Sequence, residues 1–352
     1  MHSPHPRAPN AKNKRYYSMI RRTILSVAFC LLTGCAQSVS KAPQSTIRLL
    51  QKNNIAANPL DFHNGQVHPR YLWKIGPATI IRVPLDNSLG IPSIDGQING
   101  QDTRLILDTG NAFPVLLDAS SAAAIGMPTI RGGSLKGTGI GGNVDVLLTE
   151  YDSISILNRK ILGRGIAGVF LHSYSKTFAG LTVDEIQLNL LGLPLLEQFS
   201  SVTIDAPRNE VVFAYKRSFT PPEKAASFPF TIQDGRMWVK IKIGSQELTA
   251  FLDTGCGSGL RLSKAAMDAL PKSALTSSHL RKRRAMGVGG VEQEYVGVLR
   301  EASLGSVRIT PLEFDIGAGS PDMLLGWLPF KQSRITIDFE KKKVWVEPSR
   351  TN

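Results

Sequence analysis

The chain has 352 residues, of which 42% are hydrophobic and only 7% aromatic, and it contains 32 glycines. This length allows one large domain or two of ordinary size, and frequent glycine favours a β-rich fold with many turns. The formal charge of +13 falls by six to +7 without residues 1–34, which hold six basic residues and no acid. The sequence has no nucleic-acid-binding motif to go with this charge, so we expect no nucleic-acid partner. Three cysteines exclude a disulfide framework.

Residues 1–34 end in the pattern of a secretion signal. The basic pair Arg21-Arg22 precedes an apolar run and then small residues, a stretch too short for a membrane-spanning helix. Its end, Leu32-Thr33-Gly34-Cys35, resembles a bacterial lipobox. The resemblance implies cleavage before Cys35 and attachment of lipid, palmitate included, to the thiol, which would anchor the chain to a membrane leaflet.

Nothing after Cys35 resembles a signal for retention in the inner membrane. We therefore expect a lipoprotein of the bacterial cell envelope, at the outer membrane and facing the periplasm. The alternative is an ordinary signal peptide whose cysteine is coincidental. Translation from Met19 would give either signal normal proportions.

Residues 35–74 are rich in Ser, Gln, Asn and Pro, so we expect a tether that leads into the folded domain. Within it, the short run Thr46–Leu50 is compatible with a helical turn or an edge strand.

A β pattern begins at residues 80–85 and opens an N-terminal lobe that we place at 75–219. Residues 94–98 lead into Asn99-Gly100, a strong hairpin signal. The apolar run Leu105–Leu107 then ends on Asp108. Further along we expect strands at 144–148 and 154–157 and a short helix at 120–125.

The second half of the chain repeats the first. Residues 250–255 repeat residues 105–110, an apolar run that ends on Asp-Thr-Gly, at a constant offset of 145 positions. A Gly-rich loop, a Leu-Leu-Gly segment and a strand ending on aspartate then recur in the same order. These landmarks lie at 137–142, 190–192 and 202–205 in the first half and at 287–290, 324–326 and 335–338 in the second. Such repetition indicates a duplicated domain with two lobes and one shared cleft.

We place the linker at 220–227 and the C-terminal lobe at 228–350. Residues 265–270, stopped by Pro271, are its short helix candidate. The first half is longer by 11 positions between its Asp-Thr-Gly and its Leu-Leu-Gly, and we expect that insertion within residues 163–178.

Asp-Thr-Gly after a hydrophobic strand, a Gly-rich hairpin, and then hydrophobic-hydrophobic-Gly resembles the aspartic peptidases. Each half is similar to a retropepsin-like subunit, and the whole is similar to a bilobed, pepsin-like or bacterial retropepsin-like enzyme. The resemblance covers residues 75–350. It implies a mainly β, acid-protease fold of two β-barrel lobes, in which water activated between Asp108 and Asp253 hydrolyses peptide bonds without metal or cofactor.

The chemistry of two neighbouring carboxylates agrees with this implication. Two such groups within hydrogen-bond reach do not both ionise easily, so one keeps a proton and the pair titrates as a unit; aspartic proteases are the established example of this effect. The charged partner can take a proton from water while the protonated partner donates to a carbonyl oxygen.

The resemblance also assigns supporting roles. Thr109 and Thr254 would cross-brace the two catalytic loops, and Gly110 and Gly255 would let the chain turn beneath the carboxylates. Both Leu-Leu-Gly segments would pack under these loops. The flaps that close over an extended peptide or protein substrate would be formed by Gly139, Ile140, Gly141, Gly142, Gly287, Val288, Gly289 and Gly290. Because one chain supplies both lobes, we expect a monomer.

Some features depart from the resemblance. The residue after Asp-Thr-Gly is usually small, whereas here it is Asn111 in one half and Cys256 in the other. A catalytically silent peptide-binding or scaffold lipoprotein is therefore the alternative function. A peptide-like bond outside ordinary proteins is an alternative substrate. The basic run Arg281–Arg284 either favours an acidic partner or is a solvated loop.

Overall fold

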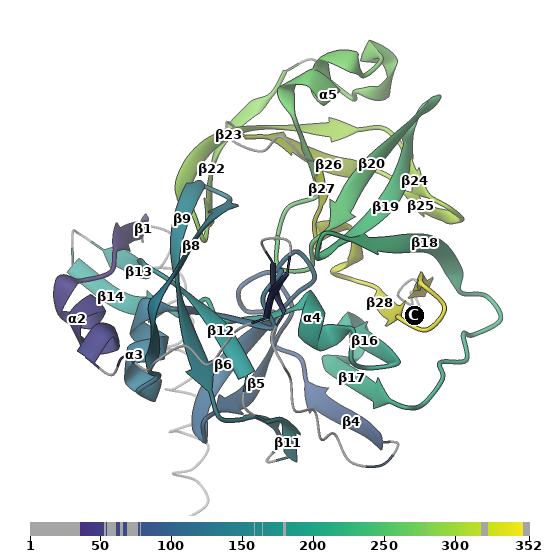
Figure 1. Ribbon diagram of the computed structural model, residues 1–352. Helices are drawn as coiled ribbons and strands as arrows, with labels where there is room; N and C mark the ends of the chain where they lie inside the picture. Colours follow the sequence, from purple (N-terminus) through teal and green to yellow (C-terminus); the bar gives the residue numbers. More distant parts are fainter. Residues whose placement is uncertain are drawn as a thin grey trace, which may run out of the picture. The chain divides into compact units, whose positions relative to one another are not determined.

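The computed structural model describes residues 36–52, 54, 61–63, 66–68, 77, 79–157, 159–163, 165–178, 181–277, 279–317 and 323–347 (Figure 1). The predicted signal segment and Cys35 lie outside these residues. The chain divides into two compact units, one of Val39–Ser173 with Gln187–Asn352 and one of Met1–Ser38 with Tyr174–Ile186. The larger unit contains both halves of the sequence repeat, so the two lobes can be described together.

The N-terminal lobe is built on a nine-stranded sheet with the strand order β11-β10-β5-β6-β15-β7-β12-β9-β8. Its helices are α3 (Ala119–Ile125) and α4 (Leu193–Leu196). The strands are β5 (Ser93–Ile98), β6 (Gln101–Asp108), β7 (Val115–Asp118), β8 (Thr129–Gly139), β9 (Gly142–Tyr151), β10 (Ile154–Ile156), β11 (Arg159–Leu162), β12 (Gly165–Phe170) and β15 (Leu190–Gly192).

The C-terminal lobe repeats this arrangement, because its strand order β19-β20-β27-β21-β26-β23-β22 matches β5-β6-β15-β7-β12-β9-β8. Its helices are α5 (Lys264–Ala269) and the 3-10 turns η3 (Lys272–Ala274) and η4 (Leu328–Phe330). The strands are β19 (Arg236–Ile243), β20 (Gln246–Leu252), β21 (Leu260–Leu262), β22 (Arg281–Gly287), β23 (Gly290–Leu299), β24 (Ala302–Leu304), β25 (Val307–Ile309), β26 (Leu312–Ile316) and β27 (Leu324–Leu325).

A six-stranded antiparallel sheet joins the two lobes in the order β18-β29-β28-β16-β17-β4, seen at the lower right of Figure 1. At its centre, the hydroxyls of Thr203 and Thr336 lie 2.8 Å apart across the pair β16–β28. Each half of the repeat supplies three of the strands. They are β4 (Thr79–Pro84), β16 (Ser201–Asp205) and β17 (Glu210–Tyr215), separated by the turn η2 (Ala206–Arg208), and β18 (Ala226–Gln233), β28 (Arg334–Asp338) and β29 (Lys343–Glu347).

Local sequence signals account for most of these elements. In β19, Met237, Val239, Ile241 and Ile243 are buried while the lysines between them are exposed, the alternation of a strand with one face on the core. The predicted Asn99-Gly100 turn is present, and both residues have positive φ. Both predicted short helices are present and start at equivalent caps, the Asp118 and Ser263 side chains. Together with the duplicated sheets, this confirms the predicted mainly β, two-lobed fold.

Residues 36–52, which we expected to be a tether, instead form β1 (Ala36–Lys41) and α2 (Gln44–Lys52). Leu50 on α2 is only 1% exposed, and its carbonyl accepts a hydrogen bond from the Thr129 hydroxyl at 3.0 Å. Thr46–Leu50 is therefore helical rather than an edge strand, because burial of Leu50 stabilises the helix against the lobe. Farther along, β2 (Asp61–His63) pairs with β3 (Gln66–His68).

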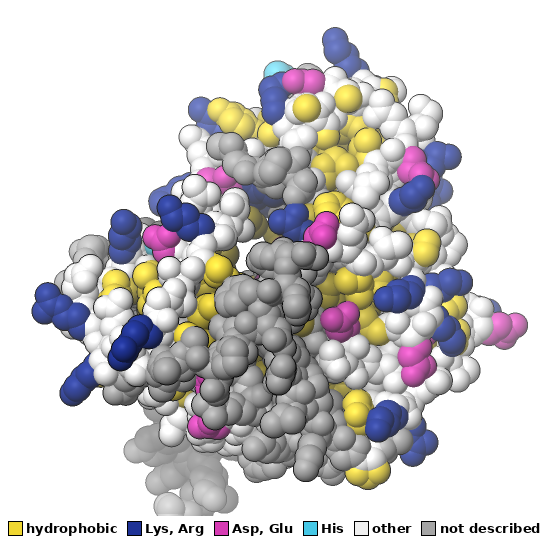
Figure 2. Space-filling view, viewed as in Figure 1, with side chains coloured by type: hydrophobic (Ala, Val, Ile, Leu, Met, Phe, Trp, Pro, Cys, Tyr) yellow, Lys and Arg dark blue, Asp and Glu magenta, His cyan; other side chains and the backbone are white. Residues whose placement is uncertain are grey.

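The extra residues of the first half form β13 (His172–Phe178) and β14 (Leu181–Ile186), which pair as a hairpin in a sheet with β1. The insertion thus follows β12, the counterpart of β26, so it starts late in the predicted range 163–178 and extends beyond it. In the C-terminal half, β18 begins at Ala226, within the segment predicted as a linker. In the part of the chain that the structure describes, no helix is long and apolar enough to cross a membrane. The described Lys and Arg side chains visible in Figure 2 are dispersed among acidic ones.

Candidate active site

The two Asp-Thr-Gly segments lie where buried strands end. Leu105, Leu107 and Leu252 are fully buried in β6 and β20, and Asp108 and Asp253 follow. The Leu-Leu-Gly segments run parallel beside these strands and hold the turns: Gly192 lies opposite Asp108, and the Asp253 N–H donates to the Leu325 carbonyl at 2.9 Å. The packing expected of both Leu-Leu-Gly segments is thus observed.

The carboxyl groups of Asp108 and Asp253 meet at the junction of the lobes and share a hydrogen bond. Each carboxyl also crosses to the glycine of the other loop. A Cβ on Gly110 would lie 2.5 Å from Asp253 Cγ, and a Cβ on Gly255 would lie 2.5 Å from Asp108 Cγ. The glycines are therefore required by close approach rather than by an unusual φ.

Thr109 and Thr254 cross-brace the two loops. The Thr109 hydroxyl donates to the Leu252 carbonyl at 2.8 Å, and the Thr254 hydroxyl donates to the Leu107 carbonyl at 2.6 Å. Each hydroxyl also accepts from the backbone N–H of the other threonine, at 3.1 and 3.2 Å. Four hydrogen bonds buried between the lobes fix the relative position of the two carboxyl groups, as the sequence led us to expect.

Burial shifts the pKa of both carboxyl groups above the usual value, and the closeness of the two groups modifies that shift. Burial, the charge of Asp253 and the hydrogen bond to it hold the pKa of Asp108 well above its usual value. Burial also raises the pKa of Asp253, but the hydrogen bond from Asp108, the N–H groups of Gly255 and Cys256, and the charge of Arg236 oppose that shift. The pair therefore keeps one proton above the usual carboxyl pKa, and the charge of Arg236 favours the ionised form of Asp253.

The two unusual residues after Asp-Thr-Gly make other contacts. Asn111 Oδ1 accepts from the Phe113 N–H at 3.0 Å, and Cys256 Sγ lies 3.0 Å from the Ser258 hydroxyl. Burial, followed by the charge of Asp253, raises the pKa of the Cys256 thiol to about 12, so it stays protonated and unreactive at neutral pH.

The two predicted flap tips contact each other across the junction of the lobes. The hairpin β8–β9 turns at Ile140-Gly141, and the Gly289 N–H of hairpin β22–β23 donates to the Ile140 carbonyl at 2.9 Å. The contact is so close that a Cβ on Gly141 would lie 2.3 Å from the Gly290 carbonyl carbon, and one on Gly289 would lie 2.3 Å from the Gly142 oxygen. Glycine at these positions lets the two backbones interlock.

Side chains beside the tips also cross between the lobes. Ile140 packs against an apolar cluster of the C-terminal lobe that contains Phe251, Cys256 and Leu324. In the opposite direction, the ring of His172 hydrogen-bonds the backbone of Val288. His172 was not among the predicted site residues, because its place beside the second flap depends on tertiary structure alone.

Arg236 is a second residue that sequence reasoning missed. Its guanidinium lies 4.9 Å above the Phe251 ring, and its charge acts on Asp253. The repeat offset of 145 assigns Ile91 as its counterpart. Aligning the two halves and searching for positions that are charged in one half only would have identified Arg236.

Among the described residues, no group of three His, Cys, Asp or Glu side chains is placed to hold a metal ion. A family model described as aspartyl protease matches residues 94–163 and 239–327. These two regions contain both Asp-Thr-Gly segments and both flap tips. No curated protein matches the chain. The double match supports a retropepsin-like aspartic protease.

Proposed function

We propose that this protein is an aspartic endopeptidase that hydrolyses peptide bonds with water activated between Asp108 and Asp253. The observation that carries this proposal is the hydrogen-bonded pair of carboxyl groups at the lobe junction, each framed by the glycine of the other loop. The aspartyl protease match to both halves supports it. The cross-bracing and the flaps supply the rigidity and the closure that such chemistry needs.

The unequal protonation of the pair assigns the first steps. The Asp253 carboxylate takes a proton from the bound water, whose oxygen attacks the scissile carbonyl carbon, while Asp108 donates its proton to the carbonyl oxygen. The resulting tetrahedral diol returns a proton to Asp108. Asp253 passes its proton to the amide nitrogen as the C–N bond breaks. The products are a carboxylic acid and an amine, and the pair again holds one proton.

The interlocked tips must part before a peptide can enter. The substrate then lies extended beneath them, because strand edges bind extended peptides through their backbones. The glycines that allow the tips to meet also let them close again without a side chain in the way.

A library of peptides incubated with the purified protein at about pH 3 to 8 tests the activity. Cleavage that both Asp108→Asn and Asp253→Asn abolish supports the proposal. A protein that binds peptides but cleaves none of them would instead support the alternative function, a catalytically silent peptide-binding lipoprotein.

We further propose that a lipid on Cys35 anchors the enzyme in the cell envelope, at the outer membrane. The lipobox-like Leu32–Cys35 supports this placement. Labelling with radioactive palmitate tests it, with Cys35→Ala as the control. Equal labelling of both proteins would exclude lipidation at Cys35.

A further inference from the structure

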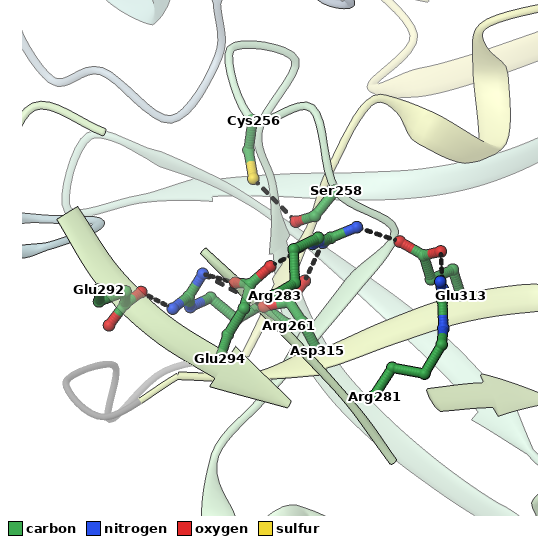
Figure 3. A network of polar contacts seen from close by, with 9 residues as sticks. All are labelled: Cys256, Ser258, Arg261, Arg281, Arg283, Glu292, Glu294, Glu313 and Asp315. Carbon is green, nitrogen blue, oxygen red and sulfur yellow. Dashed lines mark hydrogen bonds and ion pairs between the residues drawn. The ribbon is translucent and has the colours of Figure 1, made fainter. Parts of the chain in front are cut away.

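A network of ion pairs in the C-terminal lobe runs from the catalytic loop to the flap (Figure 3). Ser258 lies in the loop after Asp253, and Arg261 lies on β21. Arg283, Glu292 and Glu294 lie on the flap hairpin β22–β23, and Glu313 and Asp315 lie on β26. We call these seven residues the polar wall: Ser258, Arg261, Arg283, Glu292, Glu294, Glu313 and Asp315.

The contacts of the polar wall are continuous. Arg261 Nη1 lies 3.1 Å from Asp315 Oδ1 and 3.3 Å from Glu294 Oε2, and Arg261 also pairs with Glu292. Arg283 donates to Glu294 and to Glu313, both at 2.6 Å. The basic run Arg281–Arg284 therefore lies on a paired strand rather than a loop, with Arg283 partly buried in the wall and the other three side chains exposed.

The wall extends from the loop after Asp253 to the flap hairpin β22–β23. Ser258 contacts Cys256, whose own N–H bonds the Asp253 carboxylate. At the other end, Glu292 is two residues from the flap-tip Gly290. Along β23, Glu292 and Glu294 share the inward face, since alternate residues of a strand point the same way. Charged groups thus run behind the catalytic loop and the flap of the C-terminal lobe.

The N-terminal lobe is apolar at the same positions. The offset of 145 equates Ser258 with Phe113 and Arg261 with Leu116. Strand pairing equates Asp315 with Gly168, because Arg261 pairs with Asp315 as Leu116 pairs with Gly168.

The flap strands show the same contrast, and the apolar counterparts also contact one another. Counting from equivalent hairpin tips equates Glu294 with Val146. A Cβ on Gly168 would lie 2.7 Å from Leu116, 2.9 Å from Val146 and 3.5 Å from Phe113. Equivalent positions of the two lobes therefore hold ions in the C-terminal lobe and hydrocarbon in the N-terminal lobe.

The polar wall contains more acid than base. Its four carboxyl groups face the two guanidinium groups of Arg261 and Arg283. A third guanidinium, Arg281, lies 3.7 Å from Glu313 but is 76% exposed, so solvent weakens its contribution. Burial and the charge of Glu294 raise the pKa of Asp315 to about 6, against the opposing charges of Arg261 and Arg283. An additional cation would relieve this excess of negative charge.

Near Asp253, Arg236 carries the opposite charge. Gly235, beside Arg236, lies next to Ala112 of the N-terminal lobe, since a Cβ there would be 3.3 Å from the Ala112 side chain. At the equivalent place beside the polar wall, Gly257 meets Ile91. No basic residue of the repeat therefore counters the wall from across the lobe junction at this position.

We propose that the polar wall makes the enzyme select substrates with a lysine or arginine side chain on the C-terminal-lobe side of the scissile bond and an apolar side chain on the N-terminal-lobe side. This inference rests on the proposed peptidase function. Apolar side chains of the substrate complement the apolar residues around Phe113 in the N-terminal lobe. A basic side chain complements the excess of acidic groups near Ser258.

Peptides that differ only by Lys, Leu or Glu at one flanking position test the selection. With the full-length protein, kcat/KM for the Lys peptide should exceed that for the Leu peptide by about tenfold at one position. Glu294→Gln combined with Asp315→Asn should bring this ratio close to one. The exposed acids Glu247 and Glu301, both changed to Gln, provide the matched control and should keep the preference.

A second variant covers the case in which the double substitution unfolds the lobe. Ser258→Phe installs the N-terminal counterpart at the cleft end and leaves the buried ion pairs in place. It should convert the preference from Lys to Leu. Cleavage without a Lys preference at any flanking position, or a preference that survives both variants, overturns the inference while leaving the proposed function intact.

Peptide binding separates this inference from the proposed function. If no peptide is cleaved, the peptidase proposal fails, and the affinities of fluorescent Lys and Leu peptides for the wild-type protein decide the role of the wall. Tighter binding of the Lys peptide, lost in Ser258→Phe, supports the wall as a selective surface. Equal affinities overturn it.

Discussion

Thr254→Val removes one side of the cross-brace while keeping the shape of the side chain. The Thr254 hydroxyl donates to the Leu107 carbonyl at 2.6 Å and accepts from the Thr109 N–H at 3.2 Å, and both threonines are fully buried. Valine deprives two buried backbone groups of these partners, each at a cost of about 1–3 kcal/mol, so we expect the free energy of unfolding to fall by about 2–6 kcal/mol. That is a large part of the stability of a typical native protein.

Urea unfolding followed by the fluorescence of buried Trp327 measures this loss. Thr254→Ser keeps the hydroxyl and should retain most of the stability. Thr231→Val changes an exposed threonine of β18 and controls for the substitution itself. A Thr254→Val protein as stable as Thr231→Val would refute the assignment of the cross-brace as the element that holds the lobes in register.

Three further predictions follow from the site. Folded Asp108 retains a proton that the unfolded chain releases. The free energy of unfolding should therefore fall as pH rises from the ordinary carboxyl pKa to the raised one, by at most about 1.4 kcal/mol per pH unit. Asp108→Asn should flatten this slope in urea titrations across pH, and an unchanged slope would argue against the raised pKa. Gly141→Ala should lower kcat/KM with little loss of stability, because the added methyl group meets the Gly290 backbone. Gly132→Ala, also at positive φ but in open space, should leave kcat/KM unchanged. Equal losses of kcat/KM in the two variants would count against the contact between the flap tips. Buried Cys256 should resist iodoacetamide at about pH 8 and react after unfolding in urea, as mass spectrometry would show, whereas rapid labelling of the folded protein would contradict a thiol pKa of about 12.

The duplicated architecture and the central pair of the site were predictable from the sequence because their signals are local. A buried strand, a hairpin turn such as Asn99-Gly100 and a helix cap each depend on a few adjacent residues. The constant offset between Asp108 and Asp253 then related two local patterns to each other. Duplication supplied the long-range contact that a single pattern lacks.

Features that depend on distant partners were not predictable in this way. The segment at 36–52 is polar enough to suggest a tether, and its helix is anchored by one buried residue, Leu50, whose partner Thr129 is 79 positions away. Likewise, the charges of Arg281–Arg284 suggest solvent exposure, which holds for all but Arg283, because strand pairing brings Arg283 to Glu294 and Glu313. A charged residue on a strand can be exposed or can pair with a residue of a neighbouring strand, and only the tertiary structure decides between the two.

Single-turnover cleavage of one substrate by Asp108→Asn, Asp253→Asn and the double variant tests the central claim most directly. If the two carboxyl groups share one proton and act as a unit, each single substitution should remove about as much activity as the double substitution, because either one dismantles the pair. Rate losses that multiply in the double variant, or a single variant that retains most of the rate, would show that the two aspartates do not form one catalytic pair.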